Sequence, residues 1–531
     1  MDILPPIAMH SDLKTLEFDG IRRILARLAL TPYGNDAAHN LEPAPDATVA
    51  RGMRQSVSAA RQLVDAGMLP RLGEVPDVRA ALRQAGQANA ALSAQALHNI
   101  RLVSSAAAKL ATLCAQFPGL ISQPDALVAP RDWEAALERS LQPQGRLRED
   151  ASPALQELHL AFRAQQAEVD RKLREIMGDA RYHGLFDGPH ALQWHGARAV
   201  LAVRSNTAER LRGVRRGSSA GGREMLVEPL EVVGDNNRLE ALNGQIEAQN
   251  QIVLQGLTDL LRERLPALNA VLDALTWVDL ALAGGQLSAA FNASPAELVD
   301  EPVLRLDRAY HPQLLLQFQQ RQISHLVPLT LVLDDSSPLL VITGPNTGGK
   351  TVVLKTVGLL VTMAWCGLHL PAEGSCVIGN FSRIIVDVGD RQSLHHHLST
   401  FAGHVEVLKR VLEQADERTL VLMDELGTGT DPEEGAALAM ALLDELAQRK
   451  TRGIVTTHLS PLKTFAATHP WLSNASMRFD HATLAPTWEL VPGEPGQSLG
   501  LIIAEKNGLP AELVDRARAY WNELRVHPAS P

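Results

Sequence analysis

The chain has 531 residues, of which 45% are hydrophobic and 21% charged, and its formal net charge is -10. This length exceeds what a single hydrophobic core supports and predicts roughly two to four domains. The negative charge excludes a protein that binds nucleic acid over its whole surface, although it leaves room for a local basic patch. Only 4% of residues are aromatic, while Ala and Leu are abundant, which favours long helices over β-sandwiches or barrels.

The cysteines and the N-terminus indicate the compartment. The three cysteines, Cys114, Cys366 and Cys376, lie far apart or in apolar surroundings, so neither a disulfide framework nor a zinc site is predicted. Residues 1 to 10 have no basic start and no apolar stretch of signal length. The most apolar later segment, 352 to 370, carries Lys355 and is a poor membrane span. We therefore expect a cytoplasmic protein with no membrane partner.

Residues 1 to 152 show helical periodicity broken by proline and glycine, and we expect them to form the first part of a helical core. Apolar residues recur at helical spacing from Leu16 to Leu28, and Pro32-Tyr33-Gly34 is expected to stop that helix. Residues 265 to 305 are expected to add the second part of the core, with a helix broken at Gly284-Gly285.

Residues 153 to 264 are predicted to form a long helical arm. Two segments, 153 to 177 and 236 to 264, each place apolar side chains on one stripe. Between them, residues 181 to 235 are strand-like, with a short apolar run at 199 to 203. Two long helices that bracket a compact insert are typical of an antiparallel arm with a small tip at its end.

The tip insert is rich in arginine beside Gly-Ser-rich turns. Guanidinium groups on such loops suit phosphate backbones, since they contact phosphates without reading bases. We therefore expect nucleic acid to bind at the tip, although a solvated loop has the same composition. The candidate nucleic-acid-binding residues are Arg204, Arg210, Arg212, Arg215, Arg216 and Arg223.

Residues 306 to 531 carry the clearest functional motif, Gly344-Pro345-Asn346-Thr347-Gly348-Gly349-Lys350-Thr351. It reads G-x-x-x-x-G-K-T and lies between the apolar runs 339 to 342 and 352 to 354. The order strand, glycine-rich turn and helix lets backbone N–H groups converge on phosphate oxygens at a helix N-terminus. Lys350 would reach the terminal phosphates, and Thr351 would offer its hydroxyl to Mg²⁺. We expect a nucleoside triphosphate as the ligand. One of two preceding segments, 308 to 312 or 323 to 332, is expected to cover its base, but no single stacking residue is predicted.

Two later strands supply partners for this turn. The apolar run 419 to 423 ends in Asp424-Glu425, and the run 453 to 457 ends in His458. Asp424 can hold Mg²⁺ through water, Glu425 can orient and deprotonate the attacking water, and His458 can polarise that water or respond to hydrolysis. An acidic pair or a histidine at a strand end is ordinarily structural. It is their combination with the glycine-rich turn that predicts nucleotide hydrolysis.

These motifs resemble the ATPase signature set of the MutS proteins, a branch of the ABC ATPases. The resemblance rests on the segments 344–351 and 424–430, Ser399-Thr400-Phe401 and Thr456-Thr457-His458. Residues 13 to 18 and the helical core with its arm are similar to the second bacterial MutS branch, which lacks the N-terminal mismatch-reading and connector domains. The implied fold class is multidomain, with a mostly α-helical core, a long antiparallel helical clamp arm and a C-terminal α/β P-loop ATPase domain of the ABC type, at 306 to 531.

The resemblance also implies cofactors, partners and further site residues. It implies a homodimer that binds ATP and Mg²⁺ and clamps DNA with the arm. Ser399 of one subunit would face the γ-phosphate bound by the other, Gln392 would lie near the metal and the attacking water, and Asn346 would contact phosphates. The branch usually continues into a small nuclease domain of the Smr type, whereas this chain ends at Pro531, so nicking activity is not expected.

Two functions follow from these features. The first is an ATP-dependent clamp that acts on branched or mismatched DNA in recombination control or mismatch repair. The alternative is an ATPase that acts on stalled ribosomes, because a basic tip suits ribosomal RNA phosphates as well. The run His395-His396-His397 matches no common zinc spacing and is expected to be a polar loop.

Overall fold

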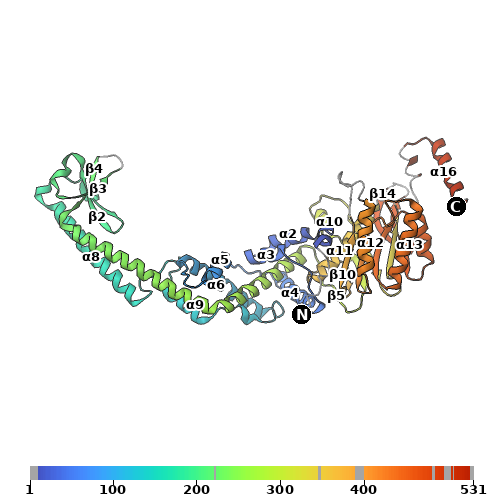
Figure 1. Ribbon diagram of the computed structural model, residues 1–531, viewed down its shortest axis with the longest axis horizontal. Helices are drawn as coiled ribbons and strands as arrows, with labels where there is room; N and C mark the ends of the chain where they lie inside the picture. The colour runs from blue at the N-terminus through green and yellow to red at the C-terminus, as the bar shows by residue number, and fades with distance from the viewer. Residues whose placement is uncertain are drawn as a thin grey trace. The chain divides into compact units, whose positions relative to one another are not determined.

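The computed structural model describes residues 10–219, 223–344, 348–388, 400–480, 485–494, 501, 504–505 and 508–526. The chain divides into two compact units (Figure 1). The first, called the α/β unit here, comprises Met1–Arg71, Thr112–Pro124 and Ala274–Pro531. The second, called the arm unit, comprises Leu72–Ala111 and Asp125–Asp273. The N-terminal helices thus share a compact unit with the segment that carries the phosphate-binding motif.

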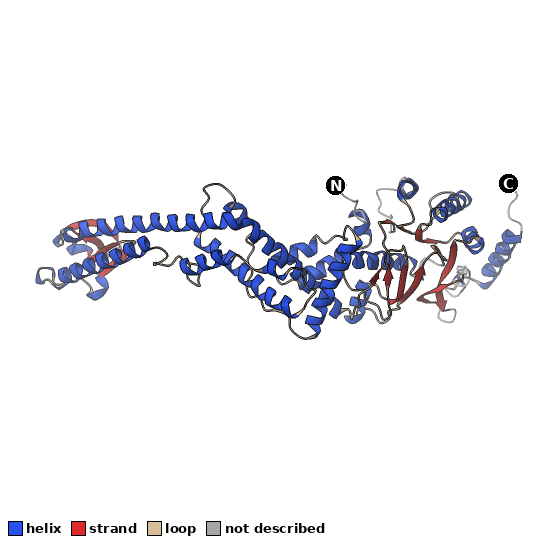
Figure 2. Ribbon diagram, turned by 90° about the horizontal axis from the view of Figure 1, so that it is seen from below, coloured by secondary structure: helices blue, strands red, loops and turns tan. Residues whose placement is uncertain are grey.

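A six-stranded sheet forms the centre of the α/β unit (Figure 2). Its strand order is β10-β11-β12-β8-β13-β14, and all neighbours are parallel except β13 and β14. Every residue of β8, β11 and β12 is buried, as expected for parallel strands that are covered on both faces. The strands are β8 (Leu339–Thr343), β10 (Arg383–Asp387), β11 (Thr419–Met423), β12 (Arg452–Thr457), β13 (Leu472–Asp480) and β14 (Ala485–Pro492).

Two apolar cores cover the two faces of this sheet. On one face, Leu340, Ile342 and Leu422 pack in the same cluster as α11 and the N-terminal helices. On the other face, Val341 and Val421 pack with α12, α13 and α14. The helices of the unit are α1 (His10–Thr15), α2 (Phe18–Leu28), α3 (Pro32–His39), α4 (Ala47–Asp65), α10 (Pro312–Gln319), α11 (Lys350–Trp365), α12 (Thr400–Gln414), α13 (Pro432–Gln448), α14 (Ser460–Thr468) and α16 (Ala511–Val526).

A second, smaller sheet of the α/β unit has the order β5-β9-β6-β7. Its longest strands, β6 and β7, are antiparallel and alternate between buried and exposed side chains, so only one face of this pair lies against the core. The strands are β5 (Glu297–Leu298), β6 (Leu304–Ala309), β7 (Leu329–Leu333) and β9 (Val377–Ile378).

The arm unit contains two long helices with a sheet inserted between them. The first follows its predicted bounds, whereas the second, predicted at 236 to 264, is α9 (Leu230–Ala290), which extends beyond both of these bounds. Helix α8 (Pro153–Gly178) begins at Ser152, whose side chain accepts a hydrogen bond from the Leu155 N–H, and Pro153 occupies the first turn. Lys172 of α8 pairs with Asp235 of α9 at 2.7 Å, and one core with the tip sheet includes Val169 and Leu173 of α8 and Val232 and Leu239 of α9. The other helices that belong wholly or partly to this unit are α5 (Arg79–Ala85), α6 (Ala94–Gln116), α7 (Arg131–Ser140), η1 (Pro124–Leu127), η2 (Ala180–Tyr182), η3 (Gly188–Ala191) and η4 (Ser205–Arg210).

The tip is an antiparallel four-stranded sheet with the order β1-β2-β4-β3. The predicted apolar run 199 to 203 lies in β2, which is buried at five consecutive positions. In β3 all residues after Gly213 are exposed, and this strand lies at one edge of the sheet. The strands are β1 (Leu192–His195), β2 (Arg198–Arg204), β3 (Gly213–Ser218) and β4 (Glu224–Pro229).

Helix α9 (Leu230–Ala290) is continuous where the sequence predicted a break at Gly284-Gly285. A Cβ added to Gly284 would lie 2.8 Å from the Val57 side chain, and one added to Gly285 would lie 2.7 Å from the Ala60 backbone. These glycines therefore serve the close approach of α4, which tertiary packing and not local propensity decides. By length and composition, α9 alone among the described helices could cross a membrane, but 44% of its most apolar window is buried, and core helices of soluble proteins pass the same test.

Candidate active site and nucleic-acid interface

Two of the predicted catalytic residues, Glu425 and His458, lie at one edge of the six-stranded sheet. Strands β10, β11, β12 and β8 are neighbours and run parallel, so their C-terminal ends lie at the same edge. These ends lead to Asp387, Asp424-Glu425, His458 and Gly344. The edge beyond the carboxyl ends of parallel strands is where open α/β sheets bind ligands.

The glycine-rich turn joins β8 to α11. Gly344 has φ +139° and Gly349 has φ +92°, and both values lie in the region that favours glycine. Gly348 is buried, and Gly349 is the residue that precedes the first turn of α11. Pro345, Asn346 and Thr347 lie outside the described residues, so their expected phosphate contacts stay a prediction.

Lys350 lies at the start of α11 with only 2% of its surface exposed. Its Nζ donates a hydrogen bond to the Gly344 carbonyl oxygen at 2.6 Å, which holds the side chain across the turn. Burial lowers the pKa of Lys350 below its ordinary value, while the charges of Asp424 and Glu425 oppose that change. The surroundings thus compensate the ammonium charge only in part, and an added anion would stabilise it.

Thr351 and Asp424, the two predicted metal ligands, are in direct contact. The Thr351 hydroxyl donates to Oδ2 of Asp424 at 2.6 Å, although the two residues are 73 positions apart. A hydroxyl and a carboxylate are hard oxygen donors, which Mg²⁺ prefers. Among the described residues no cluster of three or more His, Cys, Asp or Glu could hold a metal ion. This donor set fits a magnesium ion that takes its remaining ligands from phosphates and water.

Glu425 and His458 complete the described part of this edge. Glu425 is half-buried and has φ +52°, a left-handed conformation that is uncommon for residues other than glycine. His458 follows β12 and is exposed. Asp387 accepts a hydrogen bond from Nδ1 of His404 at 2.8 Å, which ties the end of β10 to α12. Ser399, Gln392 and His395 to His397 lie outside the described residues.

A cavity of about 510 Å³ opens beside the glycine-rich turn. Val352, Val353 and Thr356 of α11 form one wall, residues 322 to 329 form another, and Trp488 of β14 forms a third. The Trp488 ring lies 6.2 Å from that of His325, centroid to centroid. Cavities of this size with mostly apolar walls are typical small-molecule sites.

His311 adds a polar atom to this cavity. Its imidazole is 8% exposed, and burial lowers its pKa to about 4, so the ring is neutral at pH 7. Its Nδ1 is buried without a hydrogen-bond partner among the described residues. The sequence missed Trp488, which lies far from the glycine-rich turn along the chain, whereas His311 falls in one of the two segments expected to cover the base.

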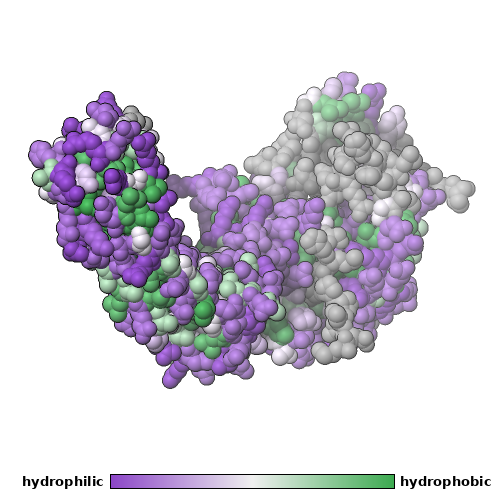
Figure 3. Space-filling model, turned by 60° about the vertical axis from the view of Figure 1, so that its left-hand side comes forward, coloured by the Kyte–Doolittle hydropathy of each residue, from purple (hydrophilic) through white to green (hydrophobic). Residues whose placement is uncertain are grey.

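The six candidate arginines of the tip are all exposed, but several hold partners within the tip. Arg204 pairs with Asp187 at 2.5 Å, and Arg216 pairs with Glu228 at 2.6 Å. Arg215 lies 3.7 Å from Glu209, and Arg210 donates to the Arg181 carbonyl oxygen at 3.1 Å. Arg212 and Arg223 are exposed as well. The tip that faces the viewer in Figure 3 is mostly hydrophilic, with a smaller apolar area.

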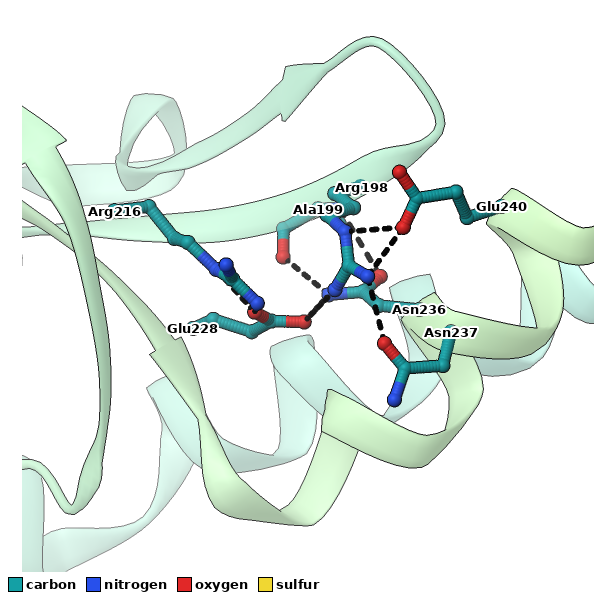
Figure 4. Close-up of polar contacts among 7 residues, drawn as sticks. All are labelled: Arg198, Ala199, Arg216, Glu228, Asn236, Asn237 and Glu240. Atoms are coloured by element: carbon teal, nitrogen blue, oxygen red, sulfur yellow. Dashed lines mark hydrogen bonds and ion pairs between the residues drawn. The ribbon is translucent and has the colours of Figure 1, made fainter.

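A buried polar cluster joins the tip sheet to α9 (Figure 4). The Glu228 side chain is fully buried and accepts hydrogen bonds from Arg198 at 2.9 Å and from Arg216 at 2.7 Å. Asn236 of α9 donates to the Ala199 carbonyl oxygen at 2.9 Å and accepts from its N–H at 3.1 Å. Asn236 also donates to Glu228 at 2.8 Å. Arg216 therefore neutralises a buried carboxylate, a role that the sequence did not reveal.

The α/β unit thus has the build of a domain that binds phosphates at the edge of a parallel sheet. Comparison with known families agrees, because residues 340–525 match MutS domain V, the ATPase domain of those proteins. The chain belongs to the MutS family and is similar to its MutS2 branch.

Three curated relatives of that branch, each named Endonuclease MutS2, match nearly the whole chain. The protein of Symbiobacterium thermophilum is 35% identical over 514 residues, which is 96% of this chain and 63% of the relative. That of Thermus thermophilus is 36% identical over 526 residues, or 97% of this chain and 66% of the relative. That of Brevibacillus brevis is 34% identical over 518 residues, or 96% and 65%. The chain therefore spans just under two thirds of the length of these relatives.

Proposed function

We propose that this protein is an ATPase whose nucleotide state controls the grip of the arm on DNA. One observation carries the ATPase assignment. A buried lysine, a hydroxyl–carboxylate pair and a second carboxylate converge at the end of a parallel sheet beside a mostly apolar cavity. We infer that the cavity takes the adenine base and that the glycine-rich turn takes the phosphates.

The roles of the residues follow from their chemistry. Lys350 neutralises the terminal phosphates, and the phosphates in turn compensate the buried ammonium group, whose pKa is lowered by burial. Thr351 and Asp424 would hold Mg²⁺, which supplies charge neutralisation for the phosphates when it is bound. Glu425 orients and deprotonates the attacking water, and His458 polarises it. We propose in addition that Ser399 acts across a homodimer and that Gln392 lies near the metal.

Two substitutions test the ATPase assignment. Lys350→Ala should lose ATP affinity, measured by equilibrium binding of a fluorescent ATP analogue. Glu425→Gln should retain ATP but lower its hydrolysis by about a hundredfold or more, because the general base is lost. Glu433→Gln, on the exposed first turn of α13, is the matched control and should hydrolyse ATP like the parent. Equal hydrolysis by Glu425→Gln and the parent would contradict the general-base role.

The cavity residues give a second test of the nucleotide site. We propose that Trp488 and His325 flank the base and that Nδ1 of His311 offers it a hydrogen bond. Trp488→Ala should raise the KM for ATP by about tenfold and leave kcat nearly unchanged, since stacking stabilises ground state and transition state alike. Trp471→Ala removes a similarly exposed tryptophan that does not line the cavity, and it should leave KM unchanged. A kcat effect with constant KM would argue against base stacking.

The arm is proposed to hold DNA through its tip, and two copies of the chain to act as a homodimer in the cytoplasm. Support for the tip comes from its exposed arginines, although Arg204 and Arg216 are already paired with carboxylates. Arg215 makes only a longer contact of 3.7 Å with the exposed Glu209, and Arg212 and Arg223 are exposed, so we take these three as the best phosphate contacts. Phosphate contacts bind without sequence preference, so selectivity for branched or mismatched DNA would arise from its shape.

The DNA assignment is tested by neutralising these three arginines. The triple variant Arg212→Gln, Arg215→Gln, Arg223→Gln should weaken DNA binding and reduce the slope of log K against log salt by about 3. A control that replaces Arg163, Arg171 and Arg174 of α8 by Gln makes the same change in net charge, at residues paired with Glu149, Glu168 and Asp170. If the control weakens binding as much as the tip variant, net charge and not the tip explains the affinity.

The ribosome alternative gains no support from the relatives, whose names refer to an endonuclease. Competition at fixed salt among four-way junctions, linear duplexes and ribosomes separates the two functions, and we expect the junction to bind most tightly. The endonuclease activity in the relatives' name belongs to those proteins. The site described above accounts for nucleotide hydrolysis and not for strand cleavage.

A further inference from the structure

We propose that Thr456 is the positioning residue that holds both catalytic carboxylates in place. This inference rests on the proposed ATPase function. Thr456 lies near the end of β12, between β11 and β8, and its side chain is completely buried. Its hydroxyl donates a hydrogen bond to Oδ1 of Asp424 and accepts one from the Glu425 N–H at 2.9 Å. A single hydroxyl group thus contacts the candidate metal ligand and the residue that carries the candidate general base.

The contact with Glu425 fixes an unfavourable backbone conformation. Glu425 has φ +52°, which a residue with a Cβ adopts only when its surroundings impose it. Two successive N–H groups are bonded to Thr456. The Glu425 N–H donates to its hydroxyl, and the Leu426 N–H donates to its carbonyl oxygen at 2.9 Å. This left-handed turn sets the direction in which the Glu425 carboxylate leaves the end of β11. Thr456 therefore determines where the candidate general base points.

The contact with Asp424 fixes the carboxylate from one side. Oδ1 accepts from Thr456 and Oδ2 accepts from Thr351, while the Asp424 N–H donates to the Asp387 carbonyl oxygen at 2.8 Å. The two hydroxyls differ in their expected duties. Thr351 is expected to turn its oxygen toward Mg²⁺, whereas Thr456, buried in the sheet, keeps Asp424 oriented throughout.

Threonine at this position has a shape that valine reproduces without the hydroxyl. Thr456→Val therefore removes both hydrogen bonds with little change in packing, and Thr456→Ser restores the hydroxyl. A matched control is available immediately before the opposite end of β12. Thr451 is equally buried, and its hydroxyl donates to the Asp416 carbonyl oxygen at 3.1 Å, away from both carboxylates.

The first measurement needs neither nucleotide nor metal. In Thr456→Val the Glu425 N–H loses its acceptor, so its hydrogen exchange in the nucleotide-free protein should accelerate by at least tenfold. Thr456→Ser and Thr451→Val should exchange at Glu425 like the parent. Unchanged exchange at Glu425 in Thr456→Val would overturn the proposal.

The second measurement follows ATP hydrolysis under Mg²⁺ titration. Thr456→Val should lower kcat by about tenfold or more and raise the Mg²⁺ concentration needed for half-maximal rate, with binding of a fluorescent ATP analogue in EDTA unchanged. Thr456→Ser should recover most of the loss. If Thr456→Val does not fold, Thr456→Cys keeps the size with a much weaker acceptor and takes its place. A parent protein that hydrolyses no ATP refutes the proposed function, whereas an active parent matched by Thr456→Val refutes only the role of Thr456.

Discussion

Each unit contains a buried charged side chain, and the two side chains differ in how far their surroundings compensate the charge. In the arm unit the Glu228 carboxylate is surrounded by two guanidinium groups and an amide that all donate to it. In the α/β unit the pKa of Lys350 is lowered by burial despite two nearby carboxylates. A charge that its own protein compensates serves the fold, whereas a charge that is compensated only in part is prepared for a ligand.

The largest expected effect is acid destabilisation of the α/β unit. Burial lowers the pKa of His311 and of His369 to about 4, from an unfolded value of about 6.5. The unfolded chain binds more protons between these values, so stability is fully present above pH 6.5 and is lost as pH falls toward 4. Each histidine contributes up to about 3 kcal/mol to this loss.

Hydrogen exchange measured between pH 7 and pH 4, with exchange times corrected for intrinsic rates, checks this prediction. The α/β unit, which contains His311 and His369, should open at a higher pH than the arm unit. In the arm unit burial lowers the pKa of His98. His369→Gln should flatten the dependence of stability on pH, because it removes one titrating group. Its amide, like the neutral imidazole, can still donate to one of Ser58 and Ser288 and accept from the other. If both units open at the same pH, the predicted difference in acid stability between them is wrong.

The next effect concerns the helix that both units share. In Gly285→Ala the new Cβ would lie 2.7 Å from the Ala60 backbone, so α4 and α9 must move apart. We expect a loss of about 2 to 3 kcal/mol, since backbone cannot yield as a side chain can. The change should appear as a lower midpoint of urea unfolding for the α/β unit.

A smaller loss is expected from Glu228→Gln at the tip. Removing the carboxylate leaves Arg198 and Arg216 without their shared anion. We expect a cost of about 2 kcal/mol, below the range for fully buried pairs because the two guanidinium side chains keep 21% and 41% exposure. This loss of stability should be measurable as faster hydrogen exchange in β2 and β4. Glu168→Gln, which breaks an exposed pair with Arg171, should leave the exchange of these strands unchanged.

The smallest effect has the opposite sign. Gly256 lies in the arm part of α9, where a Cβ would meet nothing within 4 Å. Gly256→Ala should therefore stabilise the protein by about 0.5 to 1 kcal/mol through helix propensity alone. It is the matched control for Gly285→Ala, because both change glycine to alanine within one helix. If both substitutions destabilise alike, contact with α4 is not the reason for the glycine at 285.

Most elements of the α/β unit were predictable because their signals are local. The apolar runs at 339, 419 and 453 became β8, β11 and β12. In the arm unit, the helix predicted at 153 to 177 is α8. The segment Pro32-Tyr33-Gly34 follows the end of α2 as expected, but it also begins α3, since Thr31 caps that helix and Pro32 fits its first turn. The signals for the end of one helix and the start of the next overlap at this segment, and the sequence analysis predicted only the end.

The sequence by itself determined the order strand, glycine-rich turn and helix, and the carboxylates at the end of the next strand. These features follow from side-chain periodicity and from the conformations open to glycine. Only the tertiary structure decided that Trp488 and His311 meet at one cavity, that Thr456 holds Asp424 and Glu425, and that Arg216 is bound to Glu228. Each of these depends on contacts between residues distant in the chain or on neighbouring strands, and the pairing of strands is set by packing of the whole sheet.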